Sequence, residues 1–176
     1  GHGISASAIQ LITAVSAIAN GGNLMKPFMV REIVDLKGNP VKIFKPQTVR
    51  RAISARTATI IKNILKTVMT AGGTGVNAAL DGYTACGKTG TARKIDGNGQ
   101  YDKSKHTASF VGFAPADNAQ ISVLVIIDEP QDKYYGGIVA APVFKQIAQQ
   151  ALNYLNVPPD SGTTKLRVSR DKGAKG

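Results

Sequence analysis

Apolar residues recur every three or four positions in three parts of the chain, which is the spacing of helices with one buried face. They predict a helix over Ser5–Ala19, where one of two serines can form the cap and a Gly-Gly pair ends the helix. A second helix is predicted after Ser54, and a third over residues 140–155, where Pro142 falls in the first turn. The buried stripe expected for the third helix is Phe144, Ile147, Ala148, Ala151, Leu152 and Leu155.

Three other segments have the composition of strands, namely Tyr83–Arg93, Thr107–Phe113 and Ile121–Ile127. The last is a continuous apolar run, as expected for a central strand buried on both faces. Its short spacing from Thr107–Phe113 predicts a hairpin, so we expect three adjacent antiparallel strands with the first and last helices packed on the sheet. Two shorter strands, Phe28–Leu36 and Val41–Phe44, are predicted on either side of a Gly-Asn-Pro turn.

Composition narrows the class of protein. A chain of 176 residues with 43% hydrophobic and 19% charged residues is one globular domain or part of a larger one. The single cysteine, Cys86, excludes an internal disulfide and a Cys-rich zinc site. No apolar run reaches the roughly 18 residues of a transmembrane helix, so no membrane span is expected within the chain.

The net charge of +11 is unevenly distributed, since residues 36–80 contain eight bases and no acid. Such a distribution favours an anionic neighbour, or it forms a solvated surface without a partner. Aromatic residues are only 6% of the chain and do not alternate with the bases, which argues against a stacking platform for nucleic acid. We therefore expect no nucleic-acid partner.

The segment Gly82–Thr89 matches the phosphate-loop pattern G-x-x-x-x-G-K-[ST] of nucleotide-binding proteins. That pattern functions when the lysine opens a helix whose N-terminal N–H groups surround a phosphate. Here Gly90, Gly97 and Gly99 follow the lysine closely and leave no room for a useful helix. We therefore treat a P-loop NTPase as an unfavoured alternative.

The second interpretation places Lys88-Thr89-Gly90-Thr91 on an extended strand, because Lys-Thr-Gly is a signature of serine acyl-transfer enzymes. A lysine beside a serine hydroxyl supplies positive charge and helps to move a proton. Two threonine hydroxyls on one side of a strand can bind a carboxylate, and a glycine leaves the backbone open for a peptide to pair along the edge. The tripeptide alone is a weak signal, and taken by itself it favours an exposed lysine in a Gly-rich turn.

A wider set of motifs strengthens the second interpretation. In these motifs the chain resembles the C-terminal half of the transpeptidase domain of class B penicillin-binding proteins. The division or sporulation type, a peptidoglycan D,D-transpeptidase, is the most similar. The matching stretches occur in the family's order: Gly1–Ser5, Ala19–Gly22, Gly72–Gly75, Gly87–Ala92, Ala108–Pro115, Gly136–Gly137 and Ala140–Phe144.

The resemblance implies an α/β (α+β) fold, an antiparallel sheet with helices on both faces, which is the C-terminal portion of the penicillin-binding transpeptidase and serine β-lactamase-like fold. It implies that a serine attacks the penultimate D-Ala of a stem peptide and that an amine resolves the acyl-enzyme. Lys88 is then part of the proton-handling network, and Thr89, Gly90 and Thr91 contact the substrate. Thr91 also offers its N–H to the oxyanion. No metal or organic cofactor is implied.

The chain departs from the family pattern in the motifs that should precede Lys88. The nucleophile motif Ser-x-x-Lys and the Ser-x-Asn motif do not occur before Lys88, and Ser169–Lys172 fits the first by chance only. We therefore expect a fragment without its nucleophile, inactive alone, with transpeptidase residues 1–158 and a basic, flexible tail or linker over 159–176. The implied parent lies on the extracytoplasmic face of the membrane and is anchored by a missing segment. Its implied partners are D-Ala-D-Ala stem peptides, β-lactams and cell-wall synthesis proteins.

Two other functions stay open at this point. A serine β-lactamase shares Lys-Thr-Gly and transfers the acyl group to water, and a non-catalytic module would only bind glycan-peptide. Among the remaining residues, Cys86 is expected to be a packed strand residue and His106 to be structural or exposed. Asp128 and Glu129 are expected to line a loop.

Overall fold

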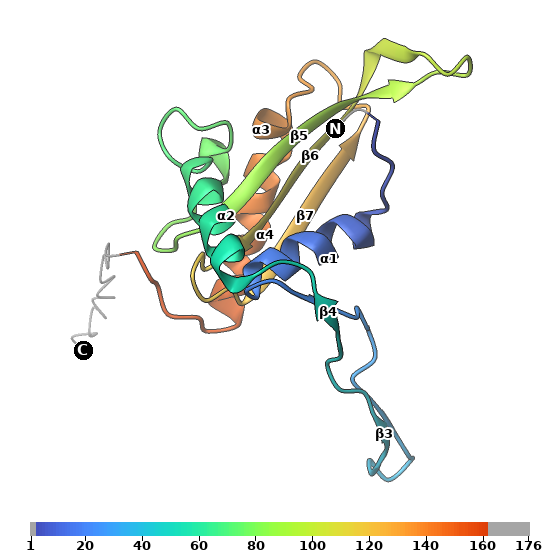
Figure 1. The fold of residues 1–176 in the computed structure, drawn as a ribbon, viewed down its shortest axis with the longest axis vertical. Helices are drawn as coiled ribbons and strands as arrows, with labels where there is room; N and C mark the ends of the chain where they lie inside the picture. The colour runs from blue at the N-terminus through green and yellow to red at the C-terminus, as the bar shows by residue number, and fades with distance from the viewer. Residues whose placement is uncertain (1–2, 162–176) are drawn as a thin grey trace, which may run out of the picture.

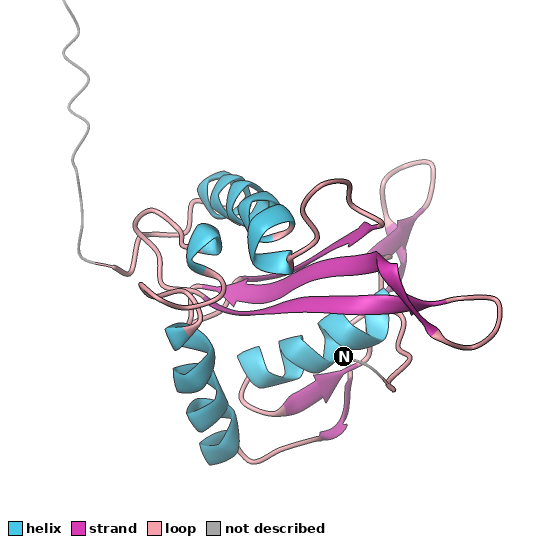
Figure 2. Cartoon of the chain, turned by 90° about the horizontal axis from the view of Figure 1, so that it is seen from above, coloured by secondary structure: helices cyan, strands magenta, loops and turns pink. Residues whose placement is uncertain are grey.

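A three-stranded antiparallel sheet forms the centre of the computed structural model, which describes residues 3–161. Its strands are β5 (Cys86–Ile95), β6 (Tyr101–Ala114) and β7 (Ile121–Asp128), with β6 in the middle. Helices α1 (Ala8–Ala19) and α2 (Ala55–Thr67) lie on one side of the strands. Helix α4 (Ala141–Tyr154) covers the other side (Figure 2). The predicted antiparallel sheet with helices on both faces is therefore confirmed.

Alternating side chains of β6 supply both halves of the core. On one side Phe110 packs against Phe144 of α4, with ring centroids 4.8 Å apart, and Leu152 joins the same cluster. On the other side Phe113 packs with Cys86 and with residues of α1 and α2. All five of these named side chains are fully buried, so the central strand fixes the positions of both helical layers.

The serine N-caps predicted for the first two helices are confirmed. Ser7 caps α1 and exchanges hydrogen bonds with Gln10 in a capping box, and Ser54 caps α2 through the Thr57 N–H. In α4 the predicted stripe is wrong at Ile147 and Leu155, which are about half exposed. Phe144, Ala148 and Leu152 have the i, i+4, i+8 spacing and face the sheet, and the two exposed residues lie beside this line.

Among the described residues, the apolar run Ile121–Ile127 does not occupy the central position predicted for it. Its strand, β7, pairs only with β6 among the described residues, so it lies at the edge of their sheet. Val125 is buried and Ile126 remains 46% exposed. An uninterrupted apolar run therefore indicated the strand correctly but not its place in the sheet.

Residues 23–51, which we call the arm, extend away from the sheet (Figure 1). In the arm β1 (Asn23–Met25) pairs with β4 (Thr48–Arg51), and β2 (Glu32–Val34) pairs with β3 (Pro40–Ile43). The hairpin of β2 and β3 was predicted, with longer strands. The short strands β1 and β4 were not predicted, because each is too short for a periodic pattern.

Three short segments complete the described chain. A single 3₁₀ turn, η1 (Val76–Ala78), falls where a short element was predicted, and α3 (Gly136–Val139) lies in the loop that precedes α4. After α4, the Asp160 carboxylate accepts hydrogen bonds from the N–H and hydroxyl of Thr84. Most of the predicted tail, including Ser169–Lys172, lies outside the described residues. Within residues 3–161 no helix is long and apolar enough to cross a membrane.

Gly87 provides a test of the packing between β5 and β6. A Cβ at this position would lie 2.6 Å from the buried Phe110 ring and 2.8 Å from the Met69 methyl group. We expect Gly87→Ala to lower the free energy of unfolding by about 1–3 kcal/mol, because the core must shift to accept one methyl group. Gly97→Ala is the matched control, since nothing lies within 4 Å of the added carbon. Urea denaturation measures both, and equal midpoints would contradict the packing described.

Candidate active site

The segment Lys88–Thr91 lies in the first half of β5, at the outer edge of the described sheet. Among residues 3–161, β5 pairs with β6 alone, and Gly90 is opposite Ser109 in the register. Strand alternation places the side chains of Thr89 and Thr91 on one face and that of Lys88 on the other. This edge strand therefore presents two hydroxyls and one ammonium group close to an unpaired backbone edge.

The Thr89 hydroxyl lies at the centre of a small polar cluster. Its Oγ1 is 3.0 Å from Oγ1 of Thr74 and 3.2 Å from Nζ of Lys88. The same ammonium group donates to the Thr89 carbonyl oxygen at 2.9 Å, so the Lys88 side chain bends round the edge of the strand toward its neighbour. The hydrogen-bond partners of Lys88 are neutral oxygens, so its positive charge stays available to an anion.

Thr74 reaches this cluster because glycines allow the turn after α2 to approach β5. Gly75 is buried, and a Cβ there would lie 2.8 Å from the Phe110 ring. Its N–H donates to the Val68 carbonyl at 2.9 Å, which ties the turn to the end of α2. A side chain at this position would push Thr74 away from the strand.

The Thr91 hydroxyl is held by the start of α3. The Gly136 N–H donates to Oγ1 of Thr91 at 3.1 Å. A Cβ on Gly136 would collide with the carbonyl oxygens of Gly90 and Ser109, so only glycine permits this contact. Asn77 supports the same turn by donating to the Gly137 carbonyl at 2.8 Å. The two threonine hydroxyls are thus oriented by separate loops.

Together these groups form a binding surface for a carboxylate. One ammonium group and two oriented hydroxyls lie within four successive residues, of which Gly90 carries no side chain. Charge-assisted hydrogen bonds of this kind are roughly twice as strong as neutral ones. No hydrogen bond in residues 3–161 joins a serine Oγ to Lys88, and these residues contain no group of three side chains able to hold a metal.

The phosphate-loop interpretation of Gly82–Thr89 lacks its structural context. Lys88 is the third residue of a ten-residue strand, and β5 continues to Ile95 without a helix. Backbone N–H groups of a helix N-terminus, which would surround a phosphate, are therefore not present after the lysine. The alternative of a P-loop NTPase is contradicted.

Cys86 is the packed strand residue that the sequence predicted. It is fully buried, and its thiol donates to the Lys62 carbonyl at 3.3 Å. Burial raises the pKa of this thiol to about 11, against the partly opposing charges of Lys66 and Lys62. Cys86 therefore does not supply the missing nucleophile.

The other polar residues singled out by sequence have structural contacts at the far end of β5. His106 is buried and stacks on Tyr134 with ring centroids 4.0 Å apart. Lys94 forms ion pairs of 2.8 Å with both Asp128 and Glu129, and its hydrogen bonds lower the pKa of each carboxyl. These two acids do not merely line a loop, because they fasten β7 to β5.

Sequence reasoning about chemistry did not assign roles to Thr74 and Gly136. Both fall in Gly-containing stretches, Gly72–Gly75 and Gly136–Gly137, that were noted only as matching motifs. The available signal was a glycine pair in a polar loop, which indicates close backbone approach but not the partner.

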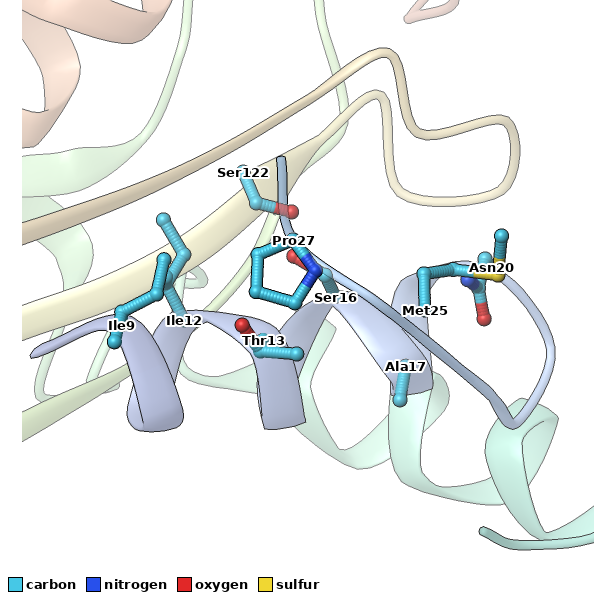
Figure 3. Close-up of a pocket in the computed structure, with 9 residues that line it drawn as sticks. All are labelled: Ile9, Ile12, Thr13, Ser16, Ala17, Asn20, Met25, Pro27 and Ser122. Atoms are coloured by element: carbon cyan, nitrogen blue, oxygen red, sulfur yellow. The ribbon is translucent and has the colours of Figure 1, made fainter. Parts of the chain in front are cut away.

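A separate apolar pocket of about 350 Å³ lies between α1, residues 25–27 and Ser122 (Figure 3). Ile9, Ile12 and Pro27 supply much of its apolar lining. None of its lining residues belongs to Lys88–Thr91, so this pocket is not part of the candidate active site.

Comparison with known proteins agrees with this geometry. Residues 1–149 match the family model described as the penicillin binding protein transpeptidase domain. The chain is 41% identical over 172 residues to the probable peptidoglycan D,D-transpeptidase PenA of Neisseria flavescens, covering 96% of this chain and 40% of the relative. It is 41% identical over 161 residues to stage V sporulation protein D of Bacillus subtilis, covering 90% of this chain and 25% of the relative.

A solved structure shows the same fold. Penicillin binding protein 3 from Mycobacterium tuberculosis, complexed with ampicillin, is similar with a TM-score of 0.78 and 30% identity. The match covers 93% of this chain and 38% of that structure. The chain therefore spans less than half the length of each of these proteins.

The buried thiol gives a direct test of the environment of β5. With a pKa of about 11 against an ordinary 9.0, Cys86 should hold about 100-fold less thiolate at pH 8 than an unfolded thiol. We expect iodoacetamide to alkylate the native chain at least that much more slowly than the urea-unfolded chain, with Cys86→Ala as the blank. Comparable labelling rates in the two states would show that the strand is accessible.

The same shift has a definite sign in a pH titration of stability. Because the pKa of Cys86 is raised in the folded state, the contribution of this thiol to the free energy of unfolding is fully present below pH 9. That contribution is lost as the pH rises toward 11. Subtracting the titration of Cys86→Ala removes the effects of lysines and tyrosines that ionise in the same range.

Proposed function

Because the chain belongs to the penicillin-binding protein transpeptidase family, we propose that it forms one wall of the active site of a peptidoglycan D,D-transpeptidase. The observation that carries the proposal is the edge strand β5, on which Lys88, Thr89 and Thr91 present an ammonium group and two oriented hydroxyls. The relatives are longer than this chain, so the activity is proposed for the whole protein that contains it.

The proposed substrate is a stem peptide that ends in D-Ala-D-Ala. Its terminal carboxylate would bind the hydroxyls of Thr89 and Thr91, with the charge of Lys88 nearby. Gly90 lets the peptide backbone approach the edge of β5, because a larger residue would obstruct pairing and would meet Ser109. The Thr91 N–H is proposed to donate to the carbonyl oxygen as negative charge develops on it.

The proposed reaction transfers an acyl group twice. A serine hydroxyl from another part of the protein attacks the carbonyl carbon of the penultimate D-Ala, and its proton moves through a network that includes Lys88 to the departing amine. The C–N bond breaks, the terminal D-Ala leaves, and an ester remains on the serine. An amine of a second stem peptide then attacks this ester, forms the cross-linking amide and releases the serine.

β-Lactams are proposed as a second class of ligand for the same strand. The M. tuberculosis structure is of a complex with ampicillin, a β-lactam with a carboxylate. In the parent of this chain that carboxylate would take the place of the substrate's terminal carboxylate on Thr89 and Thr91. The serine would then open the lactam ring and keep the acyl group.

The biological setting follows from this substrate. Because peptidoglycan lies outside the cytoplasmic membrane, the active site is proposed to lie on the extracytoplasmic face, with the parent anchored in that membrane. Similarity to PenA and to the sporulation protein supports a role in division or sporulation, together with other cell-wall synthesis proteins. Residues 1–158 are proposed as the transpeptidase portion and 159–176 as a basic linker.

Lys88→Ala in the intact parent tests this proposal. We expect acylation by a fluorescent penicillin to slow by about 100-fold or more, the scale of a lost proton-transfer group, with little change in the melting temperature. Lys103→Ala is the matched control, because Lys103 is an exposed lysine on the hairpin that follows the same strand. Equal acylation rates for the two variants would contradict the role given to Lys88.

Product analysis separates the transpeptidase from a hydrolase. With stem peptides as substrate, the intact protein should form cross-linked dimers, whereas a β-lactamase-type enzyme would hydrolyse penicillin repeatedly and form none. The 176-residue chain alone should give no penicilloyl adduct in intact-mass spectrometry, because no Ser-x-x-Lys precedes Lys88.

A further inference from the structure

Three consecutive apolar residues of the arm are exposed to solvent. Met29 is fully exposed, and Phe28 and Val30 are about half exposed. A run of this kind does not contribute to the core, and in a folded domain it is an error of design unless it serves a function. The exposed apolar run therefore makes the arm a candidate surface for binding a partner.

Two prolines interrupt the pairing of the arm at this point. The Lys26 N–H donates to the Gln47 carbonyl at 2.8 Å, which is the last contact of the first ladder. The next contact is from the Phe44 N–H to the Arg31 carbonyl, also 2.8 Å. Pro27 and Pro46 have no N–H to continue the ladder, and residues 28–30 make no backbone hydrogen bond within the described chain. The result is a segment with a bend at Met29 and with free backbone groups.

The interruption opens a pocket of about 440 Å³, which we call the arm pocket. Its walls combine apolar side chains with three ammonium groups, and no carboxylate lines it: Lys26, Phe28, Lys42, Ile43, Phe44 and Lys45. Nζ of Lys42 lies 4.9 Å from the Phe44 ring centroid, which places one charge over the aromatic wall.

The segment 25–28 separates the arm pocket from the pocket beside α1. Residues 25–28 alternate, since Met25 and Pro27 line the pocket against α1, whereas Lys26 and Phe28 line the arm pocket. Such alternation is the property of an extended strand. Lys26 and Phe28 therefore lie on the side of this segment opposite Met25 and Pro27, away from α1.

The charge of the arm is strongly one-sided. Residues 26–51 contain seven bases and two acids. Of the two acids, Asp35 accepts hydrogen bonds from the N–H groups of Lys37 and Asn39 in the hairpin turn, and Glu32 lies 3.8 Å from Arg31. Neither carboxylate is a partner of Lys26, Lys42 or Lys45 in the described contacts, so these three charges remain available to a ligand.

We propose that the arm pocket is a docking site for an acidic, extended segment of a partner protein. An apolar side chain of that segment would fill the space between Phe28 and Phe44, and carboxylates on either side would pair with the surrounding lysines. The free backbone groups of residues 28–30 would add hydrogen bonds along the segment. This function is separate from the proposed transpeptidase site, with which the pocket shares no residue.

Charge and shape favour this occupant over two others. A second copy of the chain would bring the same positive arm toward the pocket, and like charges disfavour that pairing. A membrane surface is flat, whereas the lysines here surround a concave apolar site between two ladders. An acidic extended segment would pair with the lysines, fill the pocket with an apolar side chain and bond to the free backbone groups.

Fluorescence anisotropy with a labelled octapeptide of alternating Glu and Val tests the proposal on the full chain. We expect binding that is at least about tenfold tighter than that of the matched Gln-Val peptide. The triple variant Lys26→Gln, Lys42→Gln and Lys45→Gln should weaken it about tenfold. The control variant Lys37→Gln, Lys103→Gln and Lys133→Gln has the same net charge and should bind within about twofold of the unmodified chain.

Four results would overturn the proposal. Equal losses in the two triple variants would show an effect of net charge alone, and equal binding of the Gln-Val peptide would show that carboxylates are not recognised. Binding of phosphatidylglycerol vesicles through the three pocket lysines, without peptide binding, would assign the pocket to a membrane. A dimer that forms in sedimentation and is lost in the pocket variant would assign it to a second copy. Matching circular dichroism spectra establish that both variants are folded.

Discussion

Close backbone approach to β5 is the constraint on which the candidate active site depends. The turn after α2 and the start of α3 both reach this strand, and each does so through a glycine that could not carry a side chain there. Gly75 lies against the Phe110 ring, and Gly136 lies against the carbonyl oxygens of Gly90 and Ser109. These two loops help to orient the hydroxyls of Thr89 and Thr91, because each arrives within hydrogen-bond distance.

The same constraint links the core to the chemistry. Phe110 is buried against Phe144 on one side of the sheet, and its ring also limits the space available at Gly75 and Gly87. Packing of α4 therefore sets the position of the ring, and the ring sets how near the Thr74 turn can lie to the strand. A change in α4 can alter the orientation of Thr89 without contact between the two.

Sequence reasoning identified the elements that have strong local signals. It missed the features that are decided by contacts between elements far apart in the sequence. The capped helices, the three long strands and Lys88-Thr89-Gly90-Thr91 follow from periodicity and motif. The edge position of β7, the exposure of Ile147 and Leu155, and the roles of Thr74 and Gly136 are decided by tertiary contacts. Periodicity gives the face of an element, but it does not say which other element covers that face. The P-loop match shows the reverse case, since its letters agree and its strand context does not.

The contact between Asp160 and Thr84 joins the end of the described chain to the entrance of β5. Asp160 and Ser161 donate their N–H groups to the Gly82 carbonyl, and the Asp160 carboxylate holds Thr84, two residues before β5 begins. The segment that follows α4 is therefore tied to the residues that lead into β5. Loss of the Asp160 carboxylate would free the entrance of the strand that carries Lys88 and both threonines.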